Sequence, residues 1–409
     1  MNQKIPESSK THSVWLEIVI FVLFLLGPLT GNIINVLFRV LSTDFNVSQN
    51  SILLAIPAFM FPFAITQLFS GAISDTKGRV PVLISGLILF AVAMLIAAFS
   101  FNLEMYIIAN IVGGIGFGFI NPVLIALMSD ISSPQNIPKK MGYLGASANL
   151  GVGLGPLIAS QMILIGWQSI YILFIILTCI CLIYFYFAKR PPQHLSNKTG
   201  IRNFLSQLSK EWRRLPVLLM MLSALLISHT YIAINIWTSK AVAMAHVLNE
   251  TIIGIILFLA GIGAAITGLL TGNLIKKSNA RFPLILGSVI LLSSVLILTL
   301  IGDISIPERI SYLILGWILA GFSGGILFTI ITYYSQVLSP KGRGSLAGSL
   351  TASYFTGIAL VPLTLSPFSE NYNINGVYIV ILIISILFII VTFLLYIISK
   401  KIVSRENKF

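Results

Sequence analysis

His229 is the ionisable side chain of this sequence that lies deepest within a long apolar run, residues 216–239. An imidazole gains or loses a proton near neutral pH, so this position is suited to relaying protons. A neutral histidine that bonds two helices together is the alternative, and the sequence leaves both open. Lys240 lies eleven residues further, on the same helical face. Tyr231 and Asn235 add groups able to form hydrogen bonds with a ligand.

A second polar stripe runs along the first apolar run, residues 15–40. Asn32, Asn35 and Arg39 are spaced by three and four residues, which places them on roughly one helical face. Polar groups are costly in lipid, so we expect this face to line a water-filled cavity. At an offset of 201 residues Arg39 falls on Lys240, and the two would offer an anion two cationic contacts. A snorkelling position at the outer surface is the alternative for Arg39.

The residues that usually hold metals or attack substrates are scattered. The four histidines and two cysteines show neither metal-ligand nor nucleophile spacing; they are His12, His194, His229, His246, Cys179 and Cys181. We therefore expect no metal, no cofactor and no enzyme activity. A membrane enzyme or a receptor remains a remote alternative, and a receptor would need a sizeable extramembrane domain.

A charged turn separates the second and third apolar runs. Gly71, Asp75, Gly78 and Arg79 stand in the order G-x-x-x-D-x-x-G-R, and Gly78 permits a positive φ angle. This order resembles the loop between spans two and three of the major facilitator superfamily of secondary transporters. That resemblance implies that the four residues act in gating at the cytoplasmic side. A plain charged turn on the cytoplasmic side is the alternative.

The charged turn recurs 201 residues later, at residues 272–287, with Lys276 in the place of Asp75. Large transporter folds are built by parallel duplications of this kind. The repeat therefore favours a two-part transporter over a protein with one ordinary basic loop.

A glycine-proline motif lies in the fifth apolar run. Gly151, Gly155 and Pro156 resemble G-x-x-x-G-P-x-x-G, the signature of the drug:proton antiporter branch of the superfamily, although Ala159 replaces the last glycine. The glycines allow close helix approach, and the proline frees a backbone carbonyl. Two positions depart from the branch: Asn32 stands near the usual first-span aspartate, and Asn110 replaces a fourth-span arginine. The resemblance implies export, with generic helix packing as the alternative.

Composition places the whole chain in a membrane. Of the 409 residues, 57% are hydrophobic and 9% charged, whereas soluble domains carry about 25% charge. The net charge of +13 comes from cations in short loops rather than from a nucleic-acid-binding patch. Apolar runs predict twelve spans, near residues 15–40, 51–72, 80–101, 105–128, 141–164, 169–188, 216–239, 251–274, 282–301, 310–333, 345–365 and 376–398.

The predicted fold is an all-α integral membrane protein of two pseudo-symmetric six-helix bundles. The bundles are expected at residues 1–188 and 216–409, joined by a basic cytoplasmic linker at 189–215 with an interfacial helix around 202–214. Lys and Arg concentrate on one side of the spans, which predicts that both termini lie in the cytoplasm. No cleaved signal peptide is expected.

The predicted function is secondary active transport of a small molecule across the cytoplasmic (bacterial inner) membrane by alternating access. The leading hypothesis is a proton-coupled exporter of a drug or siderophore-like product, working as a monomer in the bilayer without nucleic acid. The alternative is an uptake permease for a nutrient such as an amino acid or nucleoside. Few acids lie in the predicted cavity, so a neutral or anionic cargo is favoured over a cation.

Overall fold

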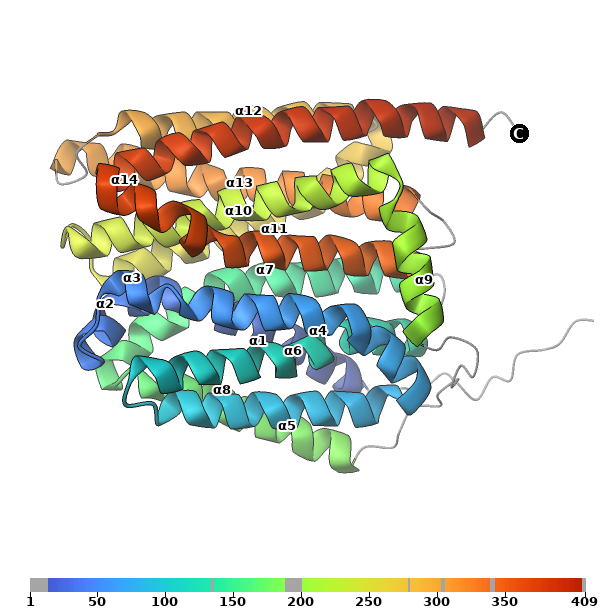
Figure 1. The fold of residues 1–409 in the computed structure, drawn as a ribbon, viewed down its shortest axis with the longest axis horizontal. Coiled ribbons are helices and arrows are strands. Elements are labelled where there is room, and N and C mark those ends of the chain that lie inside the picture. Colours follow the sequence, from blue (N-terminus) through green and yellow to red (C-terminus); the bar gives the residue numbers. More distant parts are fainter. Residues whose placement is uncertain are drawn as a thin grey trace, which may run out of the picture.

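The computed structural model describes residues 14–133, 136–187, 201–278, 280–302, 306–338 and 343–406, and this part of the chain is almost wholly helical (Figure 1). The first half contains α1 (Val14–Asn32), α2 (Ile34–Asp44), α3 (Gln49–Ile52), α4 (Ala55–Lys77), α5 (Arg79–Ala98), α6 (Leu103–Ile131), α7 (Ile137–Met162), the 3₁₀ turn η2 (Ile163–Ile165) and α8 (Gln168–Phe187). The second half contains α9 (Ile201–Trp212), α10 (Leu215–Met244), α11 (Glu250–Ser278), α12 (Arg281–Leu300), α13 (Pro307–Val337) and α14 (Arg343–Glu406).

Helix length and hydropathy make this an integral membrane protein. In the described residues, 11 helical segments are long and apolar enough to cross a bilayer. The last, Leu346–Lys400, has 55 residues, about 80 Å of helix against a hydrocarbon core of about 30 Å. Asn373 breaks this helix, with φ 57 and ψ −162. The two limbs of the helix, before and after the break, run in opposite directions (Figure 1). With its two limbs counted separately, the described residues contain twelve segments long and apolar enough to cross a bilayer, and the predicted all-α fold is confirmed.

The helix bounds follow the internal repeat found in the sequence. Shifting α1 and α2 by 201 residues gives 215–245, which matches α10, and shifting Gln49–Lys77 gives 250–278, the bounds of α11. The side chain of Lys276, which takes the place of Asp75 in the repeat, lies outside the described residues.

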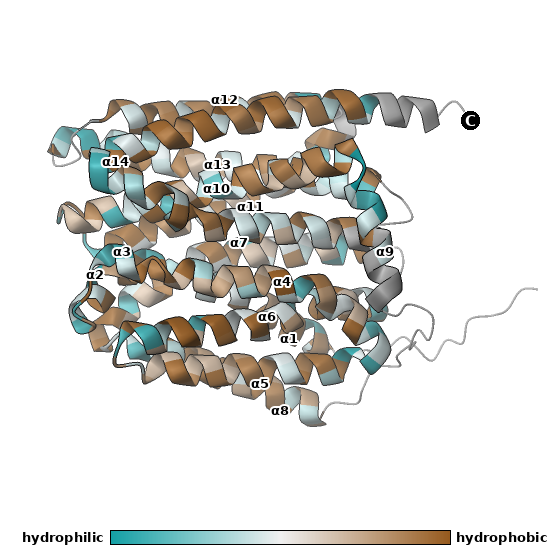
Figure 2. Ribbon diagram, viewed as in Figure 1, coloured by the Kyte–Doolittle hydropathy of each residue, from teal (hydrophilic) through white to brown (hydrophobic). Residues whose placement is uncertain are grey.

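The molecule has two polar ends, which serve below as landmarks. Helix α9 crosses one end of the molecule, which is called the linker end here. Helices α2 and α3 lie at the opposite end, which is called the distal end (Figure 1). Hydrophilic residues gather at these ends and hydrophobic ones between them (Figure 2). The predicted interfacial helix corresponds to α9, whereas residues 188–200 of the predicted linker lie outside the described part of the chain.

Helices α1–α8 and α10–α14 gather on opposite sides of the molecule (Figure 1). Two long helix pairs join these groups: α4 packs against α14, and α7 packs against α11. The repeat relates α4 to α11, so each pair joins non-equivalent helices of the two halves. Any movement of one half against the other must therefore change these two contacts.

Candidate functional site

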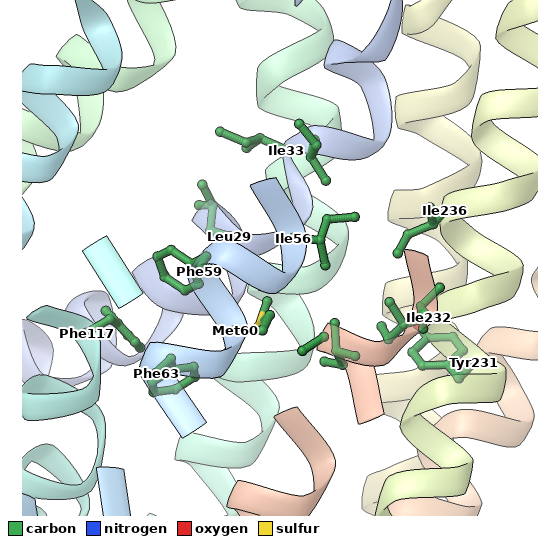
Figure 3. Packing of buried hydrophobic residues seen from close by; sticks show 14 of the residues in the cluster. Leu29, Ile33, Ile56, Phe59, Met60, Phe63, Phe117, Tyr231, Ile232 and Ile236 are labelled. Atoms are coloured by element: carbon green, nitrogen blue, oxygen red, sulfur yellow. The ribbon is translucent and has the colours of Figure 1, made fainter. Parts of the chain in front are cut away.

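The centre of the molecule, between the halves, is lined by apolar and aromatic side chains. Ile56 and Met60 of α4 lie on the side of that helix toward Ile232 of α10, and Phe63 lies near Phe117 (Figure 3). The ring centroids of Phe63 and Phe355 lie 4.3 Å apart, which joins α4 to α14. Acidic residues of the described chain stand near helix ends; they are Glu17, Asp44, Asp75, Glu104, Asp130, Glu211, Glu250, Glu308, Glu370 and Glu406.

Tyr231 and Asn235 of α10 are engaged inside the second half. The Oδ1 atom of Asn235 accepts a hydrogen bond of 2.9 Å from the indole N–H of Trp317 on α13. Tyr231 is buried, and its ring packs at the position of Gly324. The sequence suggested Tyr231 and Asn235 as groups for binding a ligand, but it could not show that neighbouring helices of the same half would engage them.

His229 joins α10 to the first limb of α14. Its Nδ1 atom lies 3.1 Å from the carbonyl oxygen of Gly357, and its Nε2 atom lies 3.2 Å from the hydroxyl of Thr364. A carbonyl only accepts, so Nδ1 must carry hydrogen. The Thr364 hydroxyl also lies 2.9 Å from the carbonyl oxygen of Leu360. Its single proton serves either Leu360 or His229, so Nε2 is the atom at which this ring gains or loses a proton.

The two asparagines of the first span take different roles. Asn32 donates from Nδ2 to the carbonyl oxygen of Pro28, one turn earlier in α1, at 2.7 Å. Asn35 is 2% exposed, and its Oδ1 atom has no hydrogen-bond partner. Both side chains are therefore buried in this conformation.

Arg39 and Lys240 lie in contacts that close the distal end. Arg39 of α2 pairs with Glu250 of α11 at 2.6 Å and lies 3.1 Å from Nδ1 of His246. Lys240 of α10 donates to Oδ1 of Asn50 on α3 and stacks over Trp237 at 4.5 Å from the ring centroid.

Asn50 completes this distal network by also donating to Glu370 of α14 at 2.6 Å. Sequence analysis missed Asn50, Glu250 and Glu370, because an isolated polar residue at a helix end carries no signal of its partner. Both cations that the sequence suggested for binding an anion are therefore engaged between the halves.

The charged turn at the linker end is a compact ionic cluster within the first half. Arg79 pairs with Asp75 at 2.5 Å and with Asp130 of α6 at 3.1 Å, and it also donates to the hydroxyl of Ser74. Gly78 has φ 96, a conformation that favours glycine. The turn thus holds the ends of α4, α5 and α6 together. Asp130 and Ser74 were not suggested by the motif.

The glycine-proline motif brings α7 against α1. A Cβ atom built on Gly151 would lie 2.5 Å from the carbonyl oxygen of Leu25, and one on Gly155 would lie 2.4 Å from that of Leu29. Only glycine fits such a close backbone approach. Pro156 stands inside α7, and its carbonyl oxygen faces Gly254 of α11. The motif therefore lies where α7 meets helices of both halves.

The contact between α7 and α11 is close over its distal part and is lost toward the linker end. A Cβ atom on Gly254 would lie 2.9 Å from the carbonyl oxygen of Pro156, and one on Gly261 would lie 2.8 Å from the Cα of Gly153. A Cβ atom on Gly268 would contact α13, and the α7 atom that it approaches, a side-chain nitrogen of Asn149, would be 4.0 Å away.

Further toward the linker end, Gly272 of α11 and Gly142 of α7 have nothing within 4 Å of such an atom. Gly272 is eleven residues from Gly261, and Gly142 is eleven residues from Gly153. Each therefore lies on nearly the same helical face as a glycine that is in contact.

The other pair of helices shows the same separation. Phe63 and Phe355 touch, but Gly71 of α4 and Gly348 of α14, both nearer the linker end, have nothing within 4 Å of an added Cβ atom. The two halves therefore meet at the distal end and diverge toward the linker end.

Sequence comparison identifies the family. The model of the Major Facilitator Superfamily matches residues 20–306 and 236–408, which together cover most of the chain. The chain belongs to the major facilitator superfamily. The superfamily is one of membrane transporters and not of enzymes.

Several bacterial members of the superfamily share part of this sequence. The methylenomycin A resistance protein of Bacillus subtilis is 27% identical over 171 residues, 41% of this chain and 37% of that protein. The quinolone resistance protein NorA of Staphylococcus aureus is 30% identical over 145 residues, 36% of this chain and 37% of that protein. The matches span little more than a third of these relatives' length.

A solved structure of the superfamily shares the fold over nearly the whole chain. The human organic anion transporter MFSD10 (TETRAN) aligns with a TM-score of 0.66 and 19% identity, covering 95% of this chain and 100% of the other. At this identity the likeness concerns the fold.

Proposed function

We propose that this superfamily member exports small amphiphilic molecules, drugs or siderophore-like products, from a bacterial cytoplasm in exchange for protons. The relatives named as resistance proteins support the export direction. The contact of Gly151 and Gly155 with α1 supports it too, since these glycines carry the antiporter-like motif. The linker end would face the cytoplasm, with both termini on that side of the inner membrane.

The observation that carries the transport mechanism is the loss of the α7–α11 contact toward the linker end. It is an arrangement with the distal side closed and the linker side open, as expected for an inward-facing carrier. Residues 1–188 and 216–409 would rock about the centre as two bundles, with 189–215 as their cytoplasmic linker. Because one duplicated chain supplies both bundles, a monomer is sufficient.

The centre between the halves supports a hydrophobic cargo that is neutral or anionic. Met60, Phe63 and Phe355 provide apolar contact area, and no acidic side chain of the described residues stands there to neutralise a cation. Burying a cation without a counter-charge is costly. A lipophilic sulfonate or an uncharged dye would therefore compete better than a quaternary amine.

Proton coupling is assigned to His229. Its Nε2 atom faces a threonine hydroxyl that either donates to the ring or accepts from it, so the site accommodates both protonation states. The bonds reach from α10 to α14, and α14 also contacts α4 of the other half. A proton gained or lost at the ring would thus act on a helix that moves during transport.

The test uses proteoliposomes with an acidic lumen and a panel of norfloxacin, ethidium, anilinonaphthalene sulfonate and Nile red. We expect accumulation of the anionic or neutral probes, lost when nigericin collapses the gradient. His229→Gln should abolish gradient-driven accumulation but retain exchange of probe for probe. Ser228→Ala is the matched control, because that hydroxyl bonds only to its own helix, at Leu225. Accumulation independent of the pH gradient would refute proton coupling.

A further inference from the structure

A small cavity inside the first half is lined by polar side chains that the proposed mechanism does not use. Its volume is about 20 Å³, and its walls come from α1, α2, α4, α5, α6 and α8. The polar residues in these walls are Thr30, Asn110, Tyr106 and Tyr171. A space of this size holds about one or two water molecules, or one hydroxyl or carbonyl group of a larger molecule.

The polar residues of the cavity form a connected cluster. The hydroxyls of Tyr106 and Tyr171 lie 2.5 Å apart, so one of them donates to the other. The Nδ2 atom of Asn110 donates to the carbonyl oxygen of Tyr106 at 2.8 Å. An amide nitrogen carries two hydrogens, of which this bond uses one, and the amide oxygen is an acceptor. The cluster can therefore donate to, and accept from, a group that enters the cavity.

The internal repeat identifies the corresponding place in the second half. A Cβ atom on Gly114 of α6 would lie 2.1 Å from the carbonyl oxygen of Phe59. In the second half, a Cβ atom on Gly321 of α13 would lie 2.4 Å from the carbonyl oxygen of Ala260. Phe59 and Ala260 are related by the 201-residue repeat, so Gly114 and Gly321 correspond as well. Helices α6 and α13 are thus related by an offset of 207 residues.

The second half holds a tryptophan where the cavity has an asparagine. At the offset of 207 residues, Asn110 corresponds to Trp317. The indole of Trp317 is fully buried and donates to Oδ1 of Asn235 at 2.9 Å. Asn235 corresponds to Ile34, another residue in the cavity walls, at the offset of 201. The cavity therefore occupies the place that the indole of Trp317 fills in the second half.

Two further exchanges shape the cavity. Leu298 of α12 packs on α13, since a Cβ atom on Gly316 would lie 3.0 Å from it. The counterpart of Leu298 in the first half is the smaller Ala97, which lines the cavity. Tyr106 takes the place of Leu313 and supplies a hydroxyl instead of an apolar side chain. The open polar space is therefore a feature of the first half and not of the repeated fold.

The cavity borders the centre of the molecule across α4. Ile56 and Met60 line the cavity, and both lie on the side of α4 toward Ile232 of the second half (Figure 3). The terminal methyl group of Met60 reaches α1, where a Cβ atom on Gly31 would lie 2.8 Å from it. Methionine side chains adapt readily, so another rotamer of Met60 would connect the cavity with the centre.

The walls of the cavity favour an uncharged polar group. None of the described residues that form them is charged. An ion in this cavity would be buried without a counter-charge, which is costly. A hydroxyl or a carbonyl could instead form hydrogen bonds with the amide of Asn110 and the tyrosine hydroxyls.

We propose that this cavity is a subsite for one small uncharged hydrogen-bonding group, a hydroxyl or a carbonyl, of the transported molecule. The apolar body of that molecule would lie at the centre, and Asn110 would determine the preference for the polar group. This subsite rests on the transport function proposed above, and it narrows the cargo from neutral or anionic amphiphiles to neutral ones.

The test compares two probes of similar size that differ in one polar group, 1-naphthol and 1-methylnaphthalene. Each is tritiated, and its binding to the purified transporter in nanodiscs is measured by scintillation proximity against empty nanodiscs. A net hydrogen bond corresponds to about 2-fold to 12-fold in affinity, and we expect 1-naphthol to bind more tightly by such a factor. Unlabelled 1-naphthalenesulfonate, the anionic probe, should compete no better than 1-methylnaphthalene.

Variants of the cavity should remove this preference. Asn110→Leu removes the amide, and Asn110→Trp introduces the side chain of the second half. Both should lower the affinity for 1-naphthol to that for 1-methylnaphthalene, whose own unchanged binding shows that the protein is folded. Tyr171→Phe removes one hydroxyl, should reduce the preference, and covers a failure of the Asn110 variants to fold. Thr178→Val is the matched control on the same helix, because its hydroxyl bonds within that helix, to Phe174.

Three results would overturn the subsite. The first is equal affinity for the two naphthalenes in the unaltered protein, or binding of neither. The second is a preference for 1-naphthol that persists in both Asn110 variants. The third is tighter binding of the sulfonate than of 1-naphthol, which would contradict an uncharged group. The binding assay uses no pH gradient, so export and proton coupling are still decided separately, by gradient-driven accumulation in proteoliposomes.

Discussion

Gly261→Ala is expected to shift this transporter toward the conformation that is open at the distal side. In the present structure the added methyl group would lie 2.8 Å from the Cα of Gly153, whereas ordinary contact begins near 3.4 Å. The helices α7 and α11 would have to separate by about 0.6 Å, and overpacking of this kind costs about 1–3 kcal/mol. We expect position 261 to be helical in both the present and the distal-open conformation. The higher helix propensity of alanine therefore stabilises both equally and does not change their population ratio. The population ratio should change by about 5-fold to 150-fold.

Gly272→Ala provides the matched control and should act in the opposite direction. Position 272 has nothing within 4 Å of an added methyl group here, and we expect it to face α7 when the linker end closes. The assay is the distance distribution between spin labels at Phe101 and Glu308, one on each half at the distal end. Longer distances should gain population in Gly261→Ala and lose population in Gly272→Ala. Equal shifts of the two variants, or none, would refute the inward-facing assignment.

Three further predictions follow from the same geometry. Asp75→Asn should lower transport in vesicles while the protein stays folded in the membrane, because Arg79 loses an ion pair; unchanged flux would contradict a gating role. Gly155→Ala should lower the thermal stability measured in detergent, because overpacking costs about 1–3 kcal/mol. Gly145→Ala is the control and should be neutral, since an added methyl group there has nothing within 4 Å. Equal stabilities of the two variants would refute the close α1–α7 approach. Arg39→Gln should raise maleimide labelling from the distal side several-fold, and unaltered labelling would exclude a role in closure.

The sequence predicted the helices and their order because these depend on local information. Apolar runs of bilayer length marked the spans, and the 201-residue repeat related α10 to α1 and α2 before any contact was known. The turn at Gly78 followed from residue type, and its positive φ agrees with that prediction.

Contacts between the halves could not be predicted in the same way. Arg39 and Glu250 are separated by more than two hundred residues, and their pairing depends on how two separate bundles meet. The environments of the glycines of α7 could not be predicted either. Gly142 and Gly153 look alike in sequence, yet Gly142 faces open space and Gly153 faces α11. That difference arises from the conformational state, which no residue pattern encodes.

The most direct test of alternating access compares two label pairs in proteoliposomes, in the presence and absence of a pH gradient. Lys77 and Gln336, both exposed, report the opening at the linker end, and Phe101 and Glu308 report the opening at the distal end. The account predicts opposite changes: the linker-end distance shortens in the same population in which the distal distance lengthens. Distances that stay fixed, or that change in the same direction at both ends, would contradict a carrier that opens to alternate sides.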